Sequence, residues 1–186
     1  MIIGLTGSFG AGKGAVVEYL VKEKGFRHFS ARALLIRELK SRNEIVDRDG
    51  MIRIANLLRK EHGPTYIIES LFKDALAFNG NAIIESIREL AGVRFIQEHG
   101  GFVIGVDADQ RLRYERAVKR GSETDSVTYE EWLSQEEQET NPDDPTKQDI
   151  RGSLKESDFI IMNNGTLEDL HEQIENVFQK ITKTLS

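Results

Sequence analysis

Residues 1–14 read MIIGLTGSFGAGKG, an apolar run that changes into a glycine-rich loop ending in a lysine. The run Ile2–Leu5 is typical of a buried strand, and residues 15–20 continue with helical spacing. The glycines between them leave out side chains where the backbone must turn tightly. A strand, a loop and a helix N-terminus in this order form an anion cradle, because the loop N–H groups, the helix dipole and Lys13 all attract negative charge. The expected ligand is a polyphosphate, which predicts a nucleotide-binding protein.

The spacing from Gly7 to Lys13 fits the phosphate-loop pattern G-x-x-x-x-G-K, and the pattern lies between a predicted strand and a predicted helix, as it must. The position after the lysine, which usually holds Ser or Thr, is Gly14. The residues predicted to hold the nucleotide phosphates are Gly7, Ser8, Phe9, Gly10, Ala11, Gly12, Lys13, Gly14 and Ala15.

Length and composition are those of one globular domain spanning residues 1–186, with 39% hydrophobic and 30% charged residues. The net charge of −6 argues against nucleic acid or an anionic membrane as the main partner. The sequence contains no cysteine, which excludes disulfides, thiolate metal sites and a cysteine–zinc lid. Because the chain opens on a strand and has no apolar stretch of about 20 residues, we expect neither a cleaved signal nor a membrane span, and therefore a cytoplasmic protein.

Predicted strands and helices alternate along the chain. We expect strands at 2–5, 26–29, 81–85, 101–107 and 158–162, and helices at 12–24, 31–42, 49–61 and 65–78, with a closing helix that ends near 183. The later strands are continuous apolar runs, which indicates that both sheet faces are covered. The sequence therefore predicts an α/β fold of the P-loop NTPase type, with a five-stranded parallel sheet flanked by helices.

Residues 121–147 contain few aliphatic side chains and are either a solvated surface excursion or a lid over the site. Basic residues on both sides of the segment favour a lid, which we place at 116–151. Trp132 and Leu133 are the candidates for anchoring a short helix of this segment onto the core. The flanking basic residues are Arg111, Arg113, Arg116, Lys119, Arg120 and Arg151.

Two carboxylates follow predicted strands, where ligands of open α/β sheets bind. Glu85 is a candidate for holding Mg²⁺ through water or for orienting an acceptor, and alternatively caps the residues after it. Asp107 is open to the same two interpretations, as ligand or as cap of the helix that begins near Gln110.

Arginines at the same predicted edge offer a second phosphate site. Arg32 follows the second strand and Arg88 follows the third, so the two predict a clamp for an acceptor phosphate, a task for which the planar guanidinium is well suited. Arg37 lies five residues beyond Arg32 and is expected at the surface. The four histidines have no metal-ligand spacing and are expected to be structural.

Several segments resemble adenylate kinases and related nucleoside monophosphate kinases. Residues 7–14 resemble the phosphate loop of that family, which also carries Gly-Lys-Gly, and residues 29–32 resemble the start of its monophosphate-binding segment. Residues 84–88 are similar to its strand end, where an acid precedes a phosphate-binding arginine. Residues 116–120 are similar to the arginine pair before its lid, and residues 163–166 to its loop against the ATP base.

The resemblance implies transfer of the ATP γ-phosphoryl group to a nucleoside monophosphate, with ATP and Mg²⁺ as cofactors and residues 30–65 as the acceptor segment. It implies catalytic roles for Lys13, Arg88, Arg116 and Arg120. It implies acceptor contacts for Ser30, Arg32, Glu85, Arg88 and Arg151, a water-mediated Mg²⁺ contact for Glu85, and base contacts for Asn164 and Gly165.

Departures from that family leave the substrate open. Ala15 stands where the family usually has Thr, Ala33 where an Asp is common, and the strand-end motif is one residue shorter and lacks Asp-Gly and Pro. Residues 3–7 and 157–161 also resemble dephospho-coenzyme A kinase. The alternatives are therefore dephospho-coenzyme A or another small hydroxyl compound as acceptor, or a nucleotide-binding module without turnover, which Ala15 favours. The oligomeric state is not readable from the sequence.

Overall fold

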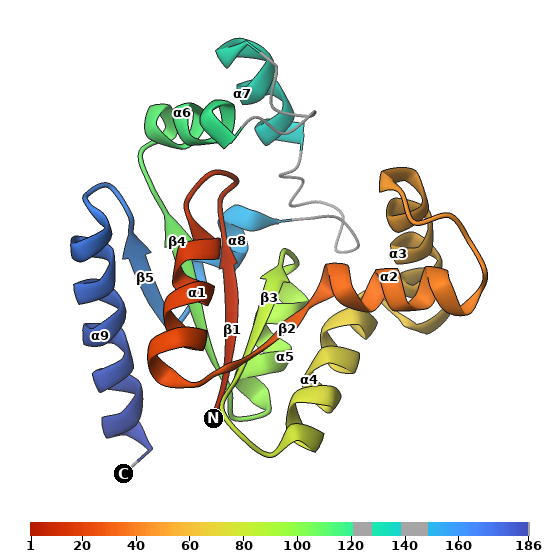
Figure 1. Cartoon of the computed structure of the whole chain (residues 1–186), viewed down its shortest axis with the longest axis horizontal. Coiled ribbons are helices and arrows are strands. Elements are labelled where there is room, and N and C mark those ends of the chain that lie inside the picture. Colours follow the sequence, from red (N-terminus) through yellow and green to blue (C-terminus); the bar gives the residue numbers. More distant parts are fainter. Residues whose placement is uncertain (121–127, 139–148, 186) are drawn as a thin grey trace.

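The computed structural model describes residues 1–120, 128–138 and 149–185. In these ranges it forms one parallel sheet of five strands in the order β2-β3-β1-β4-β5 (Figure 1). The strands are β1 (Ile2–Gly7), β2 (Arg27–Ser30), β3 (Ala82–Ile87), β4 (Phe102–Asp107) and β5 (Phe159–Met162). This confirms the predicted α/β fold, with the second strand starting one residue later than expected. Because β1 lies between β3 and β4, its carboxyl end is the crevice where such sheets bind ligands.

The helices connect these strands and cover both faces of the sheet. They are α1 (Lys13–Lys24), α2 (Ala31–Ser41), α3 (Arg48–His62), α4 (Tyr66–Phe78), α5 (Leu90–Glu98), α6 (Gln110–Arg120), α7 (Tyr129–Gln138), α8 (Ile150–Lys155) and α9 (Leu167–Thr184). Local sequence explains several ends. Gly25 adopts the left-handed conformation that closes α1, and Thr166 with Asp169 forms a capping box at the start of α9.

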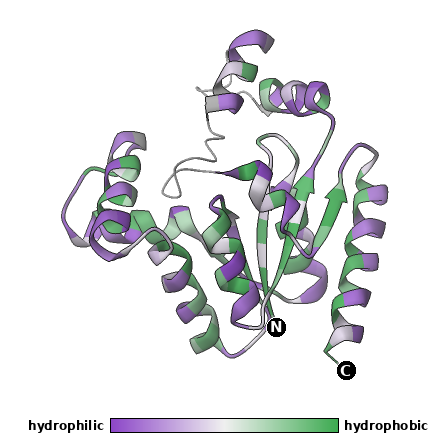
Figure 2. Cartoon of the chain, turned by 180° about the vertical axis from the view of Figure 1, so that it is seen from behind, coloured by the Kyte–Doolittle hydropathy of each residue, from purple (hydrophilic) through white to green (hydrophobic). Residues whose placement is uncertain are grey.

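Two hydrophobic cores lie on opposite faces of the sheet. One joins Ile3, Leu5 and Val106 to α1 and α9, and the other joins Ile84 and Ile87 to α2, α3, α4 and α5. Figure 2 shows the central strands as hydrophobic and the outer sides of the surrounding helices as hydrophilic. Strands that are covered on both faces are continuous apolar runs, as the sequence pattern predicts.

Two helical pairs flank the carboxyl edge of the sheet. Helices α2 and α3 project at one side, and α6 and α7 lie beyond the ends of β1 and β4 (Figure 1). Trp132 is 4% exposed and packs edge-on against Tyr114, so it anchors α7 onto α6. Residues 121–127 and 139–148 of the predicted lid lie outside the described residues, and the division into acceptor and lid segments stays a prediction.

Among the helices described, none combines the length and the apolar character that crossing a membrane requires.

Candidate active site

The loop between β1 and α1 curls around the lysine that ends it. Lys13 begins α1, and its Nζ donates to the carbonyl oxygens of Gly7 at 2.8 Å and Ser8 at 2.9 Å. The Ala11 N–H donates to the Ser8 carbonyl at 3.2 Å, which closes the turn. The ammonium group is therefore held against the backbone of the loop, so its positive charge would attract a phosphate bound by the loop amides.

Two loop glycines are required by their surroundings. Gly10 has a φ of 78°, and a Cβ there would overlap the backbone carbonyl of Arg113. Gly12 has a φ of 96°, and a Cβ there would overlap the Asn163 side chain. That Asn163 amide donates to the Ala11 carbonyl at 2.8 Å, so the close approach is itself a loop contact.

Gly14 stands in open space, since a Cβ at this position would meet no heavy atom within 4 Å. The hydroxyl that usually follows the lysine of this motif is therefore not absent for lack of room. Ala15, at the next position, is half-buried.

Glu85 lies among three basic residues at the end of β3. The His28 Nε2 lies 3.0 Å from the Glu85 Oε2, and Glu85 is paired with Ser30 in the register of β3 with β2. The hydrogen bond from His28 lowers the pKa of Glu85 below its ordinary value; burial opposes the shift, and the charges of His28, Lys13 and Arg88 add to it. The charges of Lys13 and Arg88 thus act on Glu85, which lies at the end of a strand adjacent to β1. His28, which the sequence pattern assigns to a structural role, contacts Glu85 directly.

The residue after Glu85 has an unusual backbone conformation. Ser86 has a φ of 74°, and the register of β1 with β3 shifts there, because Leu5 is opposite Glu85 whereas Thr6 is opposite Ile87. This is a β-bulge whose extra residue occupies the region that favours glycine. Ser86 therefore carries local backbone strain directly after Glu85.

The loop after β3 is fixed from both sides. The Asp149 N–H donates to the Arg88 carbonyl at 2.9 Å, which ties the start of α8 to this loop. From the other side, Arg59 of α3 donates to Glu89 at 2.9 Å, and the Glu89 side chain is only 7% exposed. The backbone at Arg88 is therefore held by the start of α8 on one side and, through Glu89, by α3 on the other.

The basic residues of α6 divide into different roles. Arg116 Nη1 donates to the Asn163 carbonyl at 2.8 Å, next to the phosphate loop. The side chain of Arg120, the other predicted catalytic arginine of α6, lies outside what the structure describes. Arg113, which the sequence analysis gives only as one of the basic residues flanking the predicted lid, is 7% exposed and donates to the loop carbonyl of Phe9. Arg113 and Arg116 are three residues apart and therefore share one side of α6, but this spacing does not indicate which of the two side chains is buried.

The loop between β5 and α9 holds the predicted base contacts. Asn164 exchanges hydrogen bonds with Asp109, accepting from its N–H at 2.8 Å and donating to its carboxylate at 3.0 Å. Gly165 lies beside Asp169. Asn164 thus joins this loop to the turn before α6, while its neighbour Asn163 makes the contact with the phosphate loop.

Arg151 and Arg32 lie on different elements, α8 and α2. Arg151 lines a small cavity of about 120 Å³ together with Ser8, Phe9 and Asp107. Arg32 is exposed on the first turn of α2, for which Ser30 is the N-cap residue. The structure therefore brings Arg151 to the phosphate loop, and places Arg32 in the first turn of α2, two residues beyond Ser30.

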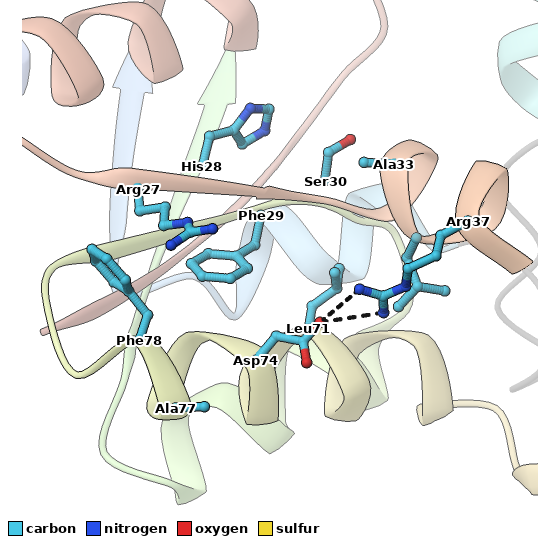
Figure 3. A pocket seen from close by; sticks show the side chains of 11 residues that line it. Arg27, His28, Phe29, Ser30, Ala33, Arg37, Leu71, Asp74, Ala77 and Phe78 are labelled. Atoms are coloured by element: carbon cyan, nitrogen blue, oxygen red, sulfur yellow. Dashed lines mark hydrogen bonds and ion pairs between the residues drawn. The ribbon is translucent and has the colours of Figure 1, made fainter.

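A larger groove of about 630 Å³ lies between β2, α2 and α4 (Figure 3). Arg27 lies 4.9 Å from the ring centre of Phe78, and Arg37 donates to Asp74 at 3.3 Å, in agreement with the surface position expected for Arg37. Lys13 does not line this groove, but His28 and Ser30 do, and His28 also contacts Glu85. We place the chemistry at the loop because the charged groups converge there.

No cluster of three or more metal-ligating side chains occurs in the described ranges.

Comparison with known proteins supports this architecture. No protein-family model matches the chain. A UPF0200 protein of Methanocaldococcus jannaschii is 28% identical over 189 residues, covering 100% of this chain and 92% of that protein. A UPF0200 protein of Sulfurisphaera tokodaii is also 28% identical, over 97% of both chains. The chain thus has relatives of similar length among the UPF0200 proteins.

Solved structures place the fold. Shikimate kinase from Aquifex aeolicus superimposes with a TM-score of 0.60 at 15% identity, covering 100% of this chain and 98% of that one. Dephospho-CoA kinase from Campylobacter jejuni gives 0.58 at 18% identity over the same shares. The fold is that of the P-loop kinases. TT1252 from Thermus thermophilus, with a TM-score of 0.65 at 20% identity over 97% of both chains, shares it.

Proposed function

We propose that this protein transfers the γ-phosphoryl group of ATP to a small phosphorylated acceptor, a nucleoside or deoxynucleoside monophosphate. The observation that carries the proposal is the convergence of Lys13, Glu85 and Arg88 at the carboxyl ends of two adjacent strands, β1 and β3. A donor-phosphate cradle beside a carboxylate and an arginine is what phosphoryl transfer needs, since the protein mainly positions two substrates and neutralises charge.

The roles follow from position. Lys13 and the amides of residues 8–12 hold the β- and γ-phosphates of ATP. Arg88, with Arg32, holds the acceptor phosphate, and Glu85 orients Mg²⁺ through water or the acceptor itself. Arg116, Arg120 and Arg151 neutralise the transferring group. The fold is consistent with this assignment, because several structures that share it are of proteins named as kinases.

Ala15 motivates a second candidate, a nucleotide-binding module without turnover. It stands where the related kinases usually have Thr, so the loop lacks a hydroxyl near the expected position of the β-phosphate or Mg²⁺. Such a module binds ATP and releases no ADP.

The test is ADP release from Mg·ATP with a panel of acceptors: AMP, CMP, UMP, GMP, their deoxy forms, dTMP and dephospho-coenzyme A. We expect turnover with a monophosphate that Lys13→Ala abolishes. Turnover with dephospho-coenzyme A alone would assign the acceptor differently. ATP binding without turnover on any acceptor would favour the binding module.

The role of Arg88 has its own measurement. Arg88→Ala is expected to raise the acceptor KM, or to lower kcat, far more than it changes the KM for ATP. Equal effects on both substrates would contradict the assignment of Arg88 to the acceptor.

A further inference from the structure

Arg113 is a buried guanidinium with contacts on three separate elements. It lies on α6, its side chain is 8% exposed, and its Nε donates to the Ala108 carbonyl at 3.0 Å. The Asp107 Oδ1 lies 3.5 Å from the same nitrogen. These contacts hold the base of the side chain at the carboxyl end of β4.

The same residue supports the tip of the phosphate loop. Its Nη1 donates to the Phe9 carbonyl at 3.3 Å, across 104 residues of sequence. Its backbone carbonyl lies against Gly10, where no Cβ fits. Arg113 therefore supports two consecutive residues at the tip of the loop, Phe9 through its guanidinium and Gly10 through its backbone carbonyl.

The outer end of the guanidinium contacts two residues of α7. Nη1 and Nη2 form a two-pronged ion pair with Glu136, in which the Nη2 bond is 3.1 Å, and the guanidinium carbon lies 5.1 Å from the centre of the Trp132 ring. A planar group with a fixed fork cannot keep both contacts if α7 moves away.

We infer that Arg113 is a positioning residue that makes the shape of the phosphate loop depend on the docking of α7. The inference deepens the proposed function, because the loop tip that Arg113 holds is the proposed donor-phosphate site. A shift of Glu136 turns the guanidinium, and the turned guanidinium releases the Phe9 carbonyl. Arg116, three residues further along α6, contacts the loop between β5 and α9 instead.

Hydrogen exchange of the protein without ligand tests the inference independently of any activity. We expect the peptide covering residues 7–12 to exchange about tenfold faster in Glu136→Gln and in Arg113→Ala than in the wild type, as the loss of a charge-assisted hydrogen bond implies. Arg113→Lys keeps the charge but not the fork and is expected to resemble Arg113→Ala.

Arg111→Ala is the matched control. Arg111 lies on the same helix and also sits over an aromatic ring of α7, that of Tyr129 at 4.9 Å, but it is exposed and pairs with Glu115. Its loss is expected to leave the exchange of residues 7–12 unchanged. Thermal melting of each variant shows that the fold is retained.

A second measurement uses the only tryptophan of the chain. Mg·ADP is expected to change Trp132 fluorescence in the wild type and in Arg111→Ala, and to bind about tenfold more weakly, with a smaller fluorescence change, to Glu136→Gln.

The outcomes separate the two proposals. Unchanged loop exchange in folded Glu136→Gln would overturn the coupling to α7, even if Arg113→Ala alone loosened the loop. Faster loop exchange in both variants would support it, even if the wild type bound no Mg·ADP. The absence of Mg·ADP binding to the wild type would count against the proposed function instead.

Discussion

His28 and Glu85 join the two strands at one edge of the sheet through a hydrogen bond of 3.0 Å, although 57 residues separate them in the sequence. The bond orients a carboxylate that Lys13 and Arg88 also influence. In metal sites, an outer hydrogen-bond partner of this kind fixes the orientation of the ligating side chain.

We expect His28→Ala to lower kcat/KM for the acceptor by about tenfold, because Glu85 loses the group that orients it. The Kd of ADP should change much less. Steady-state kinetics and ADP titration measure the two effects. His62→Ala serves as control, since His62 is an exposed histidine that stacks on Tyr66 away from the sheet. Equal losses in acceptor and nucleotide binding would indicate damage to the fold instead.

The loop glycines should respond oppositely to substitution. Gly12→Ala is expected to lower the free energy of unfolding by about 1–3 kcal/mol and to weaken ADP binding, because Ala strains at a φ of 96° and meets Asn163. Gly14→Ala should raise the free energy of unfolding by about 0.5–1 kcal/mol, since it adds helix propensity in open space. Urea unfolding compares the two variants.

Gly14→Ser restores the motif's usual residue type without a steric obstacle. We expect tighter Mg²⁺-dependent binding of ADP than in the wild type, with Gly14→Ala as the control for helix propensity alone. Equal affinities in the two variants would show that a hydroxyl at this position does not reach the metal.

The ion pair of Arg59 with Glu89 is expected to matter more than any exposed pair. Arg59→Ala leaves a carboxylate that is 7% exposed without its partner, which should cost about 3 kcal/mol of unfolding free energy. Arg94→Ala is the comparison, because Arg94 and Glu156 form an exposed pair between α5 and α8 and should contribute less than about 1 kcal/mol. Similar losses in denaturant unfolding would refute this ranking.

Stability at high pH should depend on Tyr19. Its hydroxyl donates to the Glu175 carboxylate, which raises the pKa of Tyr19 to about 12. The folded state therefore keeps the proton after the unfolded chain begins to lose it near pH 10. The contribution is fully present below about pH 10 and is lost as the pH rises towards 12.

Tyr19→Phe should consequently be less stable than the wild type at pH 8, by at most about 1 kcal/mol because solvent reaches the pair. The difference should shrink between about pH 10 and 12. Urea unfolding at a series of pH values measures it, and a difference that stays constant over this range would contradict the role of the hydrogen bond.

Much of the candidate site was predictable because it is local. The phosphate loop consists of consecutive residues, and the conformational freedom of its glycines and the charge of its lysine are properties of the residues themselves. The apolar runs of the strands determine that both sheet faces are covered. Glu85 and Arg88 were predictable as edge residues because parallel strands end at the same side of a sheet.

Contacts between distant segments were not predictable in this way. That Arg113 rather than another arginine of α6 turns inward depends on where α7 and Gly10 lie. The conformation of Ser86 depends on a bulge in the pairing of β1 with β3, for which the serine itself has no preference.

By itself, the sequence determined the phosphate loop and the alternation of strands and helices, since each depends on residues close together in the chain. The parallel sheet was predictable only through that alternation. Only the tertiary structure decided that His28 holds Glu85, that Arg113 joins the loop to α7 and that Arg59 neutralises Glu89. The physical reason is the strand order, which inserts β3 between β1 and β2 and so selects which distant charges become neighbours.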